Sequence, residues 1–100
     1  MKTTINEQDG ALVALLEGRL DTAAAAQTQR DLEPLLDCGN KDIVLDCSGL
    51  EYIASSGLRL FLTLLKNAKS RGATVYITGA NDTINETLTV TGFHNLFRFK

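Results

Sequence analysis

Apolar and polar residues follow two clear patterns in the middle of the chain. Residues 43–45 form a short apolar run rich in β-branched side chains, which is typical of a strand covered on both faces. From Leu58 onward, apolar residues recur at helical spacing, and this predicts a helix over residues 56–70. We expect Asp46 to end the strand, so that residues 47–54 form a connector between strand and helix.

The N-terminal pattern predicts an antiparallel hairpin. Residues 3–8 are mostly polar, which suits an edge strand, and Asp9-Gly10 is a typical two-residue hairpin turn. Residues 11–16 are apolar on both faces, so the strand over residues 11–17 is expected to be central in a sheet.

A first helix is predicted over residues 23–36, with Asp21 or Thr22 as its N-cap. Pro34 would remove one helical hydrogen bond and clash with the preceding turn, so we expect a kink or a break near it. Gly39-Asn40 then supplies a left-handed stop before the next strand.

The last third of the chain predicts three further elements: a strand at residues 73–78, a helix at residues 81–90 and a short strand at residues 96–99. Thr83 and Glu86 fit a capping box for this helix, and Gly92 fits its stop. Strands that alternate with helices indicate an α/β fold, in which crossovers between parallel strands are right-handed.

Ser55 and Ser56 stand at the start of the long helix, and two interpretations of the pair remain open. Ser is a favoured N-cap worth roughly 1 kcal/mol, and one serine is enough for that role. Alternatively, a phosphate esterified to Ser55 would suit the unpaired N–H groups of a helix start. Leu60, which widens the apolar arc of the helix, either packs in the core or belongs to a docking surface.

The expected topology also gathers polar side chains. In parallel α/β sheets, functional groups collect at the carboxyl ends of strands. Asp21 follows the second predicted strand, and Ser48 and Ser55 follow the third. We therefore expect these three side chains along one rim of the sheet.

Size, charge and cysteines narrow the class of protein. One hundred residues with 44% hydrophobic content fit a single globular domain over residues 1–100. The net charge of −2 gives no basic stripe, which argues against direct nucleic-acid binding. With no signal-peptide pattern and no apolar run of membrane-spanning length, we expect a cytoplasmic protein without membrane insertion. Cys38 and Cys47 lack the spacing of a metal or redox site and are expected to be reduced, with Cys47 buried.

Three motifs, in the same order along the chain, resemble those of one family. Residues 46–58, DCSGLEYIASSGL, resemble the signature of the STAS domain family, the anti-sigma factor antagonists of bacteria. Gly18-Arg19-Leu20-Asp21 resembles the Gly-x-x-Asp of that family, and residues 91–97, TGFHNLF, resemble its late Ser/Thr-Gly-Leu-x-x-Leu-Phe element. Ala54 stands where the family commonly has Asp.

The resemblance implies a fold and a function. The fold would be the STAS α/β fold, a mixed sheet of four to five strands with an N-terminal hairpin and helices mainly on one face. Ser55 would accept phosphate from an anti-sigma factor that is also a serine kinase, and a serine phosphatase would remove it. The unphosphorylated protein would bind that partner and free the sigma factor, without a cofactor or metal and as a monomer or weak dimer. The implied partner-binding residues are Asp21, Ser48, Ser55, Ser56, Gly57, Leu58 and Leu60.

Two other classes of function remain as alternatives. Related STAS domains serve as subunits of membrane transport complexes for lipids or anions, and in that role a phosphorylated serine is not required. An enzyme is less well supported, because Ser55 lacks a Gly-x-Ser-x-Gly elbow and the single imidazole, His94, lies far along the chain. Asp21, Asp46 and Glu51 fit no metal-binding loop.

Overall fold

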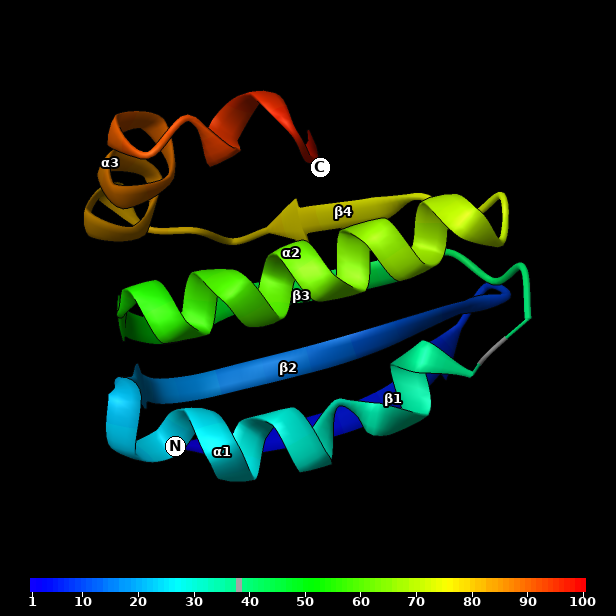
Figure 1. The fold of residues 1–100 in the computed structure, drawn as a ribbon, viewed down its shortest axis with the longest axis horizontal. Helices are drawn as coiled ribbons and strands as arrows, with labels where there is room; N and C mark the ends of the chain where they lie inside the picture. The colour runs from blue at the N-terminus through cyan, green and yellow to red at the C-terminus, as the bar shows by residue number, and fades with distance from the viewer. Residues whose placement is uncertain (38) are drawn as a thin grey trace.

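The computed structural model describes residues 1–37 and 39–100, and within them a sheet with strand order β1-β2-β3-β4-β5 (Figure 1). The elements in chain order are β1 (Lys2–Gln8), β2 (Ala11–Leu20), α1 (Thr22–Asp31), the 3₁₀ helix η1 (Glu33–Leu36), β3 (Ile43–Ile53), α2 (Ser55–Ser70), β4 (Val75–Thr78), α3 (Asp82–Val90), the 3₁₀ helix η2 (Phe93–Asn95) and β5 (Arg98–Phe99).

The N-terminal hairpin forms as predicted. β1 pairs antiparallel with β2 from Lys2 opposite Glu17 to Gln8 opposite Ala11. Asp9 and Gly10 both have positive φ angles, 53° and 80°, as the favoured two-residue hairpin turns require. β2 lies between β1 and β3, which confirms the edge position of β1 and the central position of β2.

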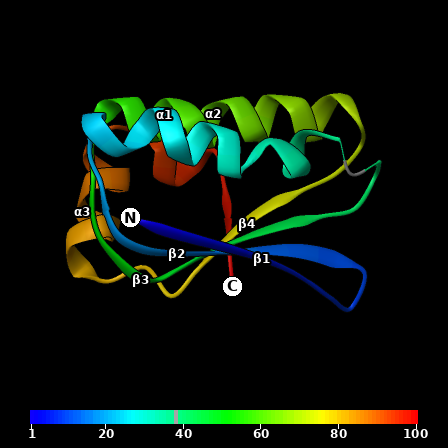
Figure 2. The same cartoon turned by 90° about the horizontal axis from the view of Figure 1, so that it is seen from below.

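The remaining strands are parallel, and their order explains the layering. β2, β3, β4 and β5 pair in sequence as parallel neighbours. Successive right-handed crossovers that advance in one direction place their helices on the same face of a sheet. Figure 2 shows α1 and α2 side by side over one face, while α3 lies at the end of the sheet where β3 finishes. The predicted α/β architecture is confirmed.

The prediction that Asp46 ends the third strand is wrong. β3 continues through the expected connector to Ile53, and β2 continues beside it to Leu20. The register between the two strands shifts twice, as at β-bulges, and on β3 the buried side chains of Cys47, Leu50 and Ile53 are three residues apart. Because bulges break the alternation of a regular strand, this half of β3 has the sequence pattern of a loop.

The first helix ends before Pro34, as expected. α1 is capped by Asp21 and finishes at Asp31, and the chain then forms η1 with Pro34 in its first turn. Proline is tolerated there because the first N–H groups of a helix have no helical partner. Gly39 has a φ of 65°, in agreement with the predicted left-handed stop.

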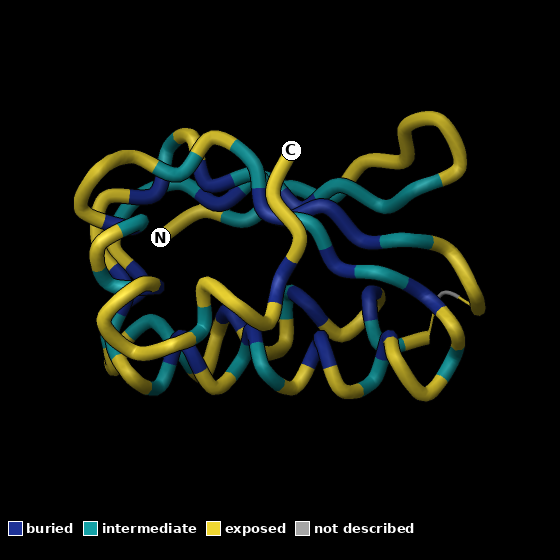
Figure 3. The backbone as a smooth tube through the Cα atoms, turned by 90° about the horizontal axis from the view of Figure 1, so that it is seen from above, coloured by how far each residue is buried: buried dark blue, intermediate teal, exposed yellow. Residues whose placement is uncertain are grey.

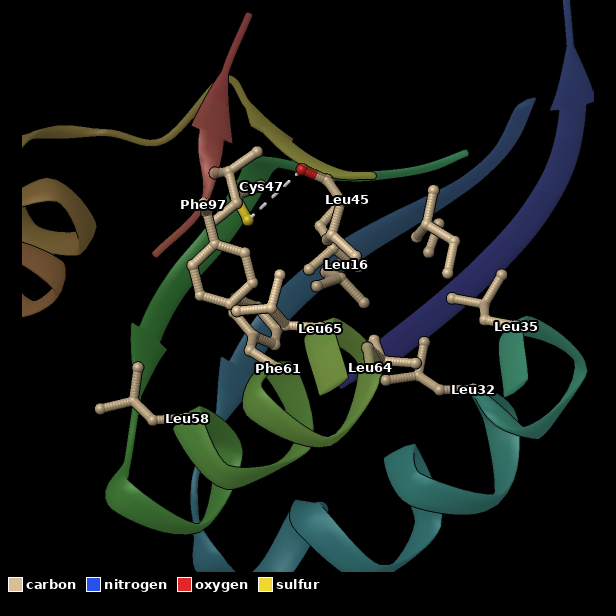
Figure 4. Packing of buried hydrophobic residues seen from close by; sticks show 14 of the residues in the cluster. Leu16, Leu32, Leu35, Leu45, Cys47, Leu58, Phe61, Leu64, Leu65 and Phe97 are labelled. Atoms are coloured by element: carbon tan, nitrogen blue, oxygen red, sulfur yellow. Dashed lines mark hydrogen bonds between the residues drawn. The ribbon is translucent and has the colours of Figure 1, made fainter. Parts of the chain in front are cut away.

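The core lies between the helices and the sheet, where Figure 3 places most buried segments. Figure 4 shows Phe61, Leu64 and Leu65 of α2 pointing toward the strands that carry Leu16 and Leu45. All five side chains are at most 5% exposed. Complete burial of one such side chain contributes roughly 1.5–3 kcal/mol, so this face of α2 holds the helix firmly on the sheet.

Cys47 belongs to this core. Its thiol donates to the carbonyl oxygen of Leu45 at 3.7 Å (Figure 4). Burial, and secondarily the charge of Asp46, raise the pKa of the Cys47 thiol to about 12. Cys47 is a free and buried thiol, as predicted, and its raised pKa keeps it protonated at neutral pH. Cys38 lies outside the described residues.

The C-terminal elements differ from the prediction mainly in their ends. β4 begins at Val75, and β5 is limited to Arg98–Phe99. The helix α3 is capped by Asn81, whose side chain accepts from the N–H of Ile84 at 2.9 Å, so Thr83 is not the N-cap. Asn is preferred over Thr at this position, which explains why the chain enters the helix two residues earlier than a Thr83 cap requires.

Candidate functional site

The candidate site lies where β2 and β3 end together. The N–H of Ala54 donates to the carbonyl oxygen of Leu20 at 2.8 Å, which ties the two strand ends to each other. Asp21 follows one strand and Ser55 follows the other, each at the start of a helix. The structure therefore brings Asp21 and Ser55 to the same edge of the sheet, as the sequence predicted.

Ser48 is not at this edge. It lies within β3, five residues before Ile53, the last residue of the strand. Its N–H donates to the side chain of Asp46 at 3.0 Å, and Gly79 packs against it. The expectation of one rim with Asp21, Ser48 and Ser55 depended on a strand that ended at Asp46, and the longer β3 overturns it.

Ser55 is exposed and occupies the first helical position of α2. The N-cap is Ala54, which makes no side-chain capping hydrogen bond, so the interpretation of Ser55 as the cap is wrong. Within residues 1–37 and 39–100, no hydrogen bond engages the Ser55 hydroxyl. The hydroxyl is therefore open to solvent and to chemical modification.

Ser56 differs from Ser55 in its surroundings. Its hydroxyl is 3.4 Å from the hydroxyl of Thr22 and donates to it. Thr22 is the first residue of α1, so this long hydrogen bond connects the starts of the two helices. Ser56 thus has a structural contact that Ser55 lacks.

Gly57 and Leu58 lie inside the protein. A Cβ atom at Gly57 would stand 2.7 Å from Cγ of Leu20 and 2.9 Å from Cγ1 of Ile53, so only glycine lets the helix approach the sheet this closely. Leu58 is 6% exposed. Their contacts with the sheet position the start of α2, and the expectation that both residues contact a partner stays a prediction.

Leu60 is half-buried between α1 and α2 and lines a groove of about 430 Å³. The groove begins next to the site, because Thr22 and Ser56 are among its lining residues. It is lined by Thr22, Ala25, Ala26, Gln29, Leu32, Leu36, Ser56, Arg59, Leu60, Thr63 and Leu64. Leu60 therefore has both a packing contact and a position beside accessible space.

Two features of the site did not follow from the sequence. The guanidinium of Arg19 lies 4.5 Å from the centre of the Tyr52 ring, in a cation–π contact between the ends of β2 and β3. Thr22 bonds to Ser56 across the two helices. Both contacts join residues more than thirty positions apart, and their only sequence signal is that each partner stands beside a motif at a strand end.

The described residues contain no group of three or more His, Cys, Asp or Glu side chains that could hold a metal ion. His94 lies in η2, and its ring packs against Phe99 with 5.3 Å between centroids. No helix in the described part of the chain is long and apolar enough to cross a membrane.

Comparison with known families decides the classification. Residues 2–100 match the family described as STAS domain. The chain belongs to the STAS domain family. The match spans all three motifs that carried the resemblance, so the recognition from sequence is confirmed, together with the STAS fold.

Two curated relatives resemble this chain along most of its length. BtrV of Bordetella bronchiseptica, named as an anti-sigma factor antagonist, is 32% identical over 97 residues, which cover 97% of this chain and 84% of that protein. The anti-sigma-B factor antagonist of Staphylococcus aureus is 29% identical over 89 residues, or 89% of this chain and 82% of that protein.

Solved structures share the STAS fold at lower sequence identity. A Thermotoga maritima protein named as an anti-sigma factor antagonist has a TM-score of 0.87 at 21% identity, over 97% of this chain and 84% of that one. The phosphorylated form of SpoIIAA from Bacillus has a TM-score of 0.74 at 17% identity, over 99% and 91%. A sulfate transporter family protein from Wolinella succinogenes has a TM-score of 0.76 at 16% identity, over 92% and 77%.

Proposed function

We propose that this protein binds an anti-sigma factor and is switched by phosphorylation of Ser55. In this proposal the anti-sigma factor is also the serine kinase that modifies Ser55, and a serine phosphatase reverses the change. The observation that carries the proposal is the exposed Ser55 hydroxyl, which has no hydrogen-bond partner among the described residues, at the position of the STAS serine motif. BtrV, 32% identical, is named as an anti-sigma factor antagonist, and one structural neighbour is a phosphorylated form.

The physics of such a switch is straightforward. A phosphoserine adds about −1.5 to −2 charge and three acceptor oxygens. On Ser55 this charge would replace a small neutral group on an exposed surface. A partner that packs closely over the unmodified hydroxyl would then face a bulky and strongly hydrated anion, and desolvation and steric overlap would weaken binding.

Asp21, Ser56 and Leu60 remain candidates for partner contact. Asp21 is partly exposed beside Ser55, and Leu60 borders the groove between α1 and α2. Ser48 lies earlier in β3 than the start of α2, so a partner that contacts both Ser48 and Ser55 must extend along β3. The proposed role of this surface is binding, and we assign it no catalysis of its own.

The alternative function, a subunit of a transport complex, shares the fold. The Wolinella succinogenes transporter family protein shows that the STAS fold alone does not separate the two roles. The curated relatives favour the antagonist, because those at 29–32% identity are named as such. A modification of Ser55 that controls binding is required only by the switch.

The experiment is affinity capture from a lysate of the native host with four tagged forms of the protein. These are wild type, Ser55→Ala, Ser55→Asp and a control, Thr83→Asp. Thr83 is exposed in the first turn of α3, so the control adds the same charge at another helix start. Captured proteins are identified by mass spectrometry.

We expect wild type, Ser55→Ala and Thr83→Asp to capture an anti-sigma factor with a kinase domain, and Ser55→Asp to lose it. Equal capture of that kinase by Ser55→Asp would contradict the switch. If all four forms instead bring down the subunits of one transporter, the alternative function replaces the proposal.

A further inference from the structure

Arg59 stands one helical turn after Ser55 on α2. The two residues are separated by four positions, and both are exposed. Residues at this spacing lie on the same side of a helix with Cβ atoms about 5–6 Å apart, and an acidic group paired with a cation four residues later is the favourable orientation. A charge added at Ser55 would therefore have Arg59 as a close neighbour.

The side chain of Arg59 is available for a new contact. Within residues 1–37 and 39–100 its guanidinium makes no hydrogen bond or ion pair, and only its backbone oxygen is engaged, by the Thr63 hydroxyl at 2.9 Å. Two other arginines are occupied, because Arg30 donates to Gln27 and Arg71 donates to Asn67. A free guanidinium presents a planar set of donors that matches the geometry of a phosphate.

We propose that Arg59 binds the phosphate of phosphorylated Ser55. This assignment rests on the proposed modification of Ser55 and adds the residue that receives it. The ligand is a phosphate monoester carried by the chain itself, and binding requires only a rotamer change of an exposed side chain. Lys66, the next cation along α2, is eleven residues from Ser55 and too far to substitute.

The position of Arg59 gives this contact a second effect. Among the described residues that line the groove between α1 and α2, Arg59 alone carries a charge. Ser56 and Leu60 line the same groove. When its guanidinium turns back to the phosphate, the mouth of the groove loses its positive charge. Phosphorylation of the Ser55 hydroxyl would thus change the charge both at the start of α2 and in the adjacent groove.

The test measures the titration of the phosphate itself. Phosphoserine is incorporated at position 55 during expression, and the ³¹P NMR signal is followed from pH 4 to 8, across a second pKa of about 6. The compared proteins are otherwise wild type, Arg59→Gln, Arg59→Lys and the control Lys66→Gln, which removes one charge from the same helix. The charged groups near the strand ends, which are Arg19, Asp21 and Glu51, are the same in all four proteins.

A bound guanidinium stabilises the dianion, so loss of Arg59 should raise the midpoint of the titration. We expect Arg59→Gln to shift it upward by about 0.3 unit, Arg59→Lys to keep most of the wild-type value, and Lys66→Gln to leave it nearly unchanged. Equal midpoints in wild type and Arg59→Gln, or equal shifts for Arg59→Gln and Lys66→Gln, would overturn the assignment. Because the phosphate is installed without a kinase, this result is independent of whether the host contains the proposed partner.

Discussion

The starts of α1 and α2 lie at the same edge of the sheet but are stabilised in different ways. At α1, a side-chain oxygen of Asp21 accepts from the N–H of Ala24 at 2.9 Å. At α2, the N-cap is Ala54, and no side chain takes that role. Asn81 caps α3 as Asp21 caps α1, so the start of α2 is the exception.

The difference shows how the start of α2 is held on the sheet while the Ser55 hydroxyl stays accessible. Gly57 allows the first turn of α2 to pack directly on Leu20 and Ile53, and this contact fixes the helix without a cap. Because no serine hydroxyl is used for capping, Ser55 remains accessible. At this site packing replaces the local hydrogen bond that stabilises the other two helix starts.

The largest expected effect on unfolding free energy comes from Gly57→Val, which disrupts the packing of α2 against the sheet. The added side chain would overlap Leu20 and Ile53, and overpacking of this kind costs roughly 1–3 kcal/mol. Urea denaturation should show this loss of unfolding free energy, while the exposed neighbour Ser55→Val, which adds a β-branched side chain without overlap, should change it much less. An equal effect of the two substitutions would mean that close packing does not hold the start of α2.

Asp21→Ala removes the cap that distinguishes α1. The N–H of Ala24 would lose its partner, and we expect a loss of about 1 kcal/mol of unfolding free energy. For a domain of this size that corresponds to a decrease of roughly 4–8 °C in Tm, which differential scanning calorimetry measures directly. Asp21→Ser keeps a capping oxygen and should recover most of the stability. If Asp21→Ser is as unstable as Asp21→Ala, the carboxylate acts through something other than capping.

The smallest effect, and the only gain, is expected from Ala54→Asp, which gives α2 the kind of cap that α1 has. A carboxylate there can accept from a free N–H of the first turn, and we expect stability to rise by about 0.5–1 kcal/mol in the same urea assay. Ala54→Asn, a cap without charge, should give a similar gain. Unchanged stability in both variants would show that the start of α2, unlike that of α1, is not stabilised by a side-chain cap.

Much of the fold could be predicted because its signals are local. Asp9-Gly10 specifies a hairpin turn, Pro34 ends α1, and the apolar spacing of α2 is helical, so each depends on a few neighbouring residues. The second half of β3 could not be predicted, because its bulges are set by pairing with β2, a partner distant in sequence. The misplacement of Ser48 followed from that one error.

The site was predictable in part for the same reason. Ser55 stands in a contiguous motif, and its position at the start of α2 follows from the helical pattern. The burial of Gly57, by contrast, depends on Leu20 of another strand, and the accessible space beside Leu60 depends on how α1 packs against α2. Distances across elements of this kind are not encoded by spacing along the chain.

The strand order described above also bears on how the protein folds. Each strand pairs with the next strand along the chain, so neighbours are separated by one turn or by a connection that contains one α-helix. Partners in the hairpin are close in sequence, whereas the partners of β2 and β3 are 31–33 positions apart and those of β3 and β4 are 32 apart. Closing these longer loops costs more entropy, so the parallel pairings are expected to form more slowly than the hairpin. As the chain leaves the ribosome, the hairpin of β1 and β2 is complete first, and β3 can join it before β4 and β5 are made. The sheet is therefore arranged in the order in which its strands are synthesised.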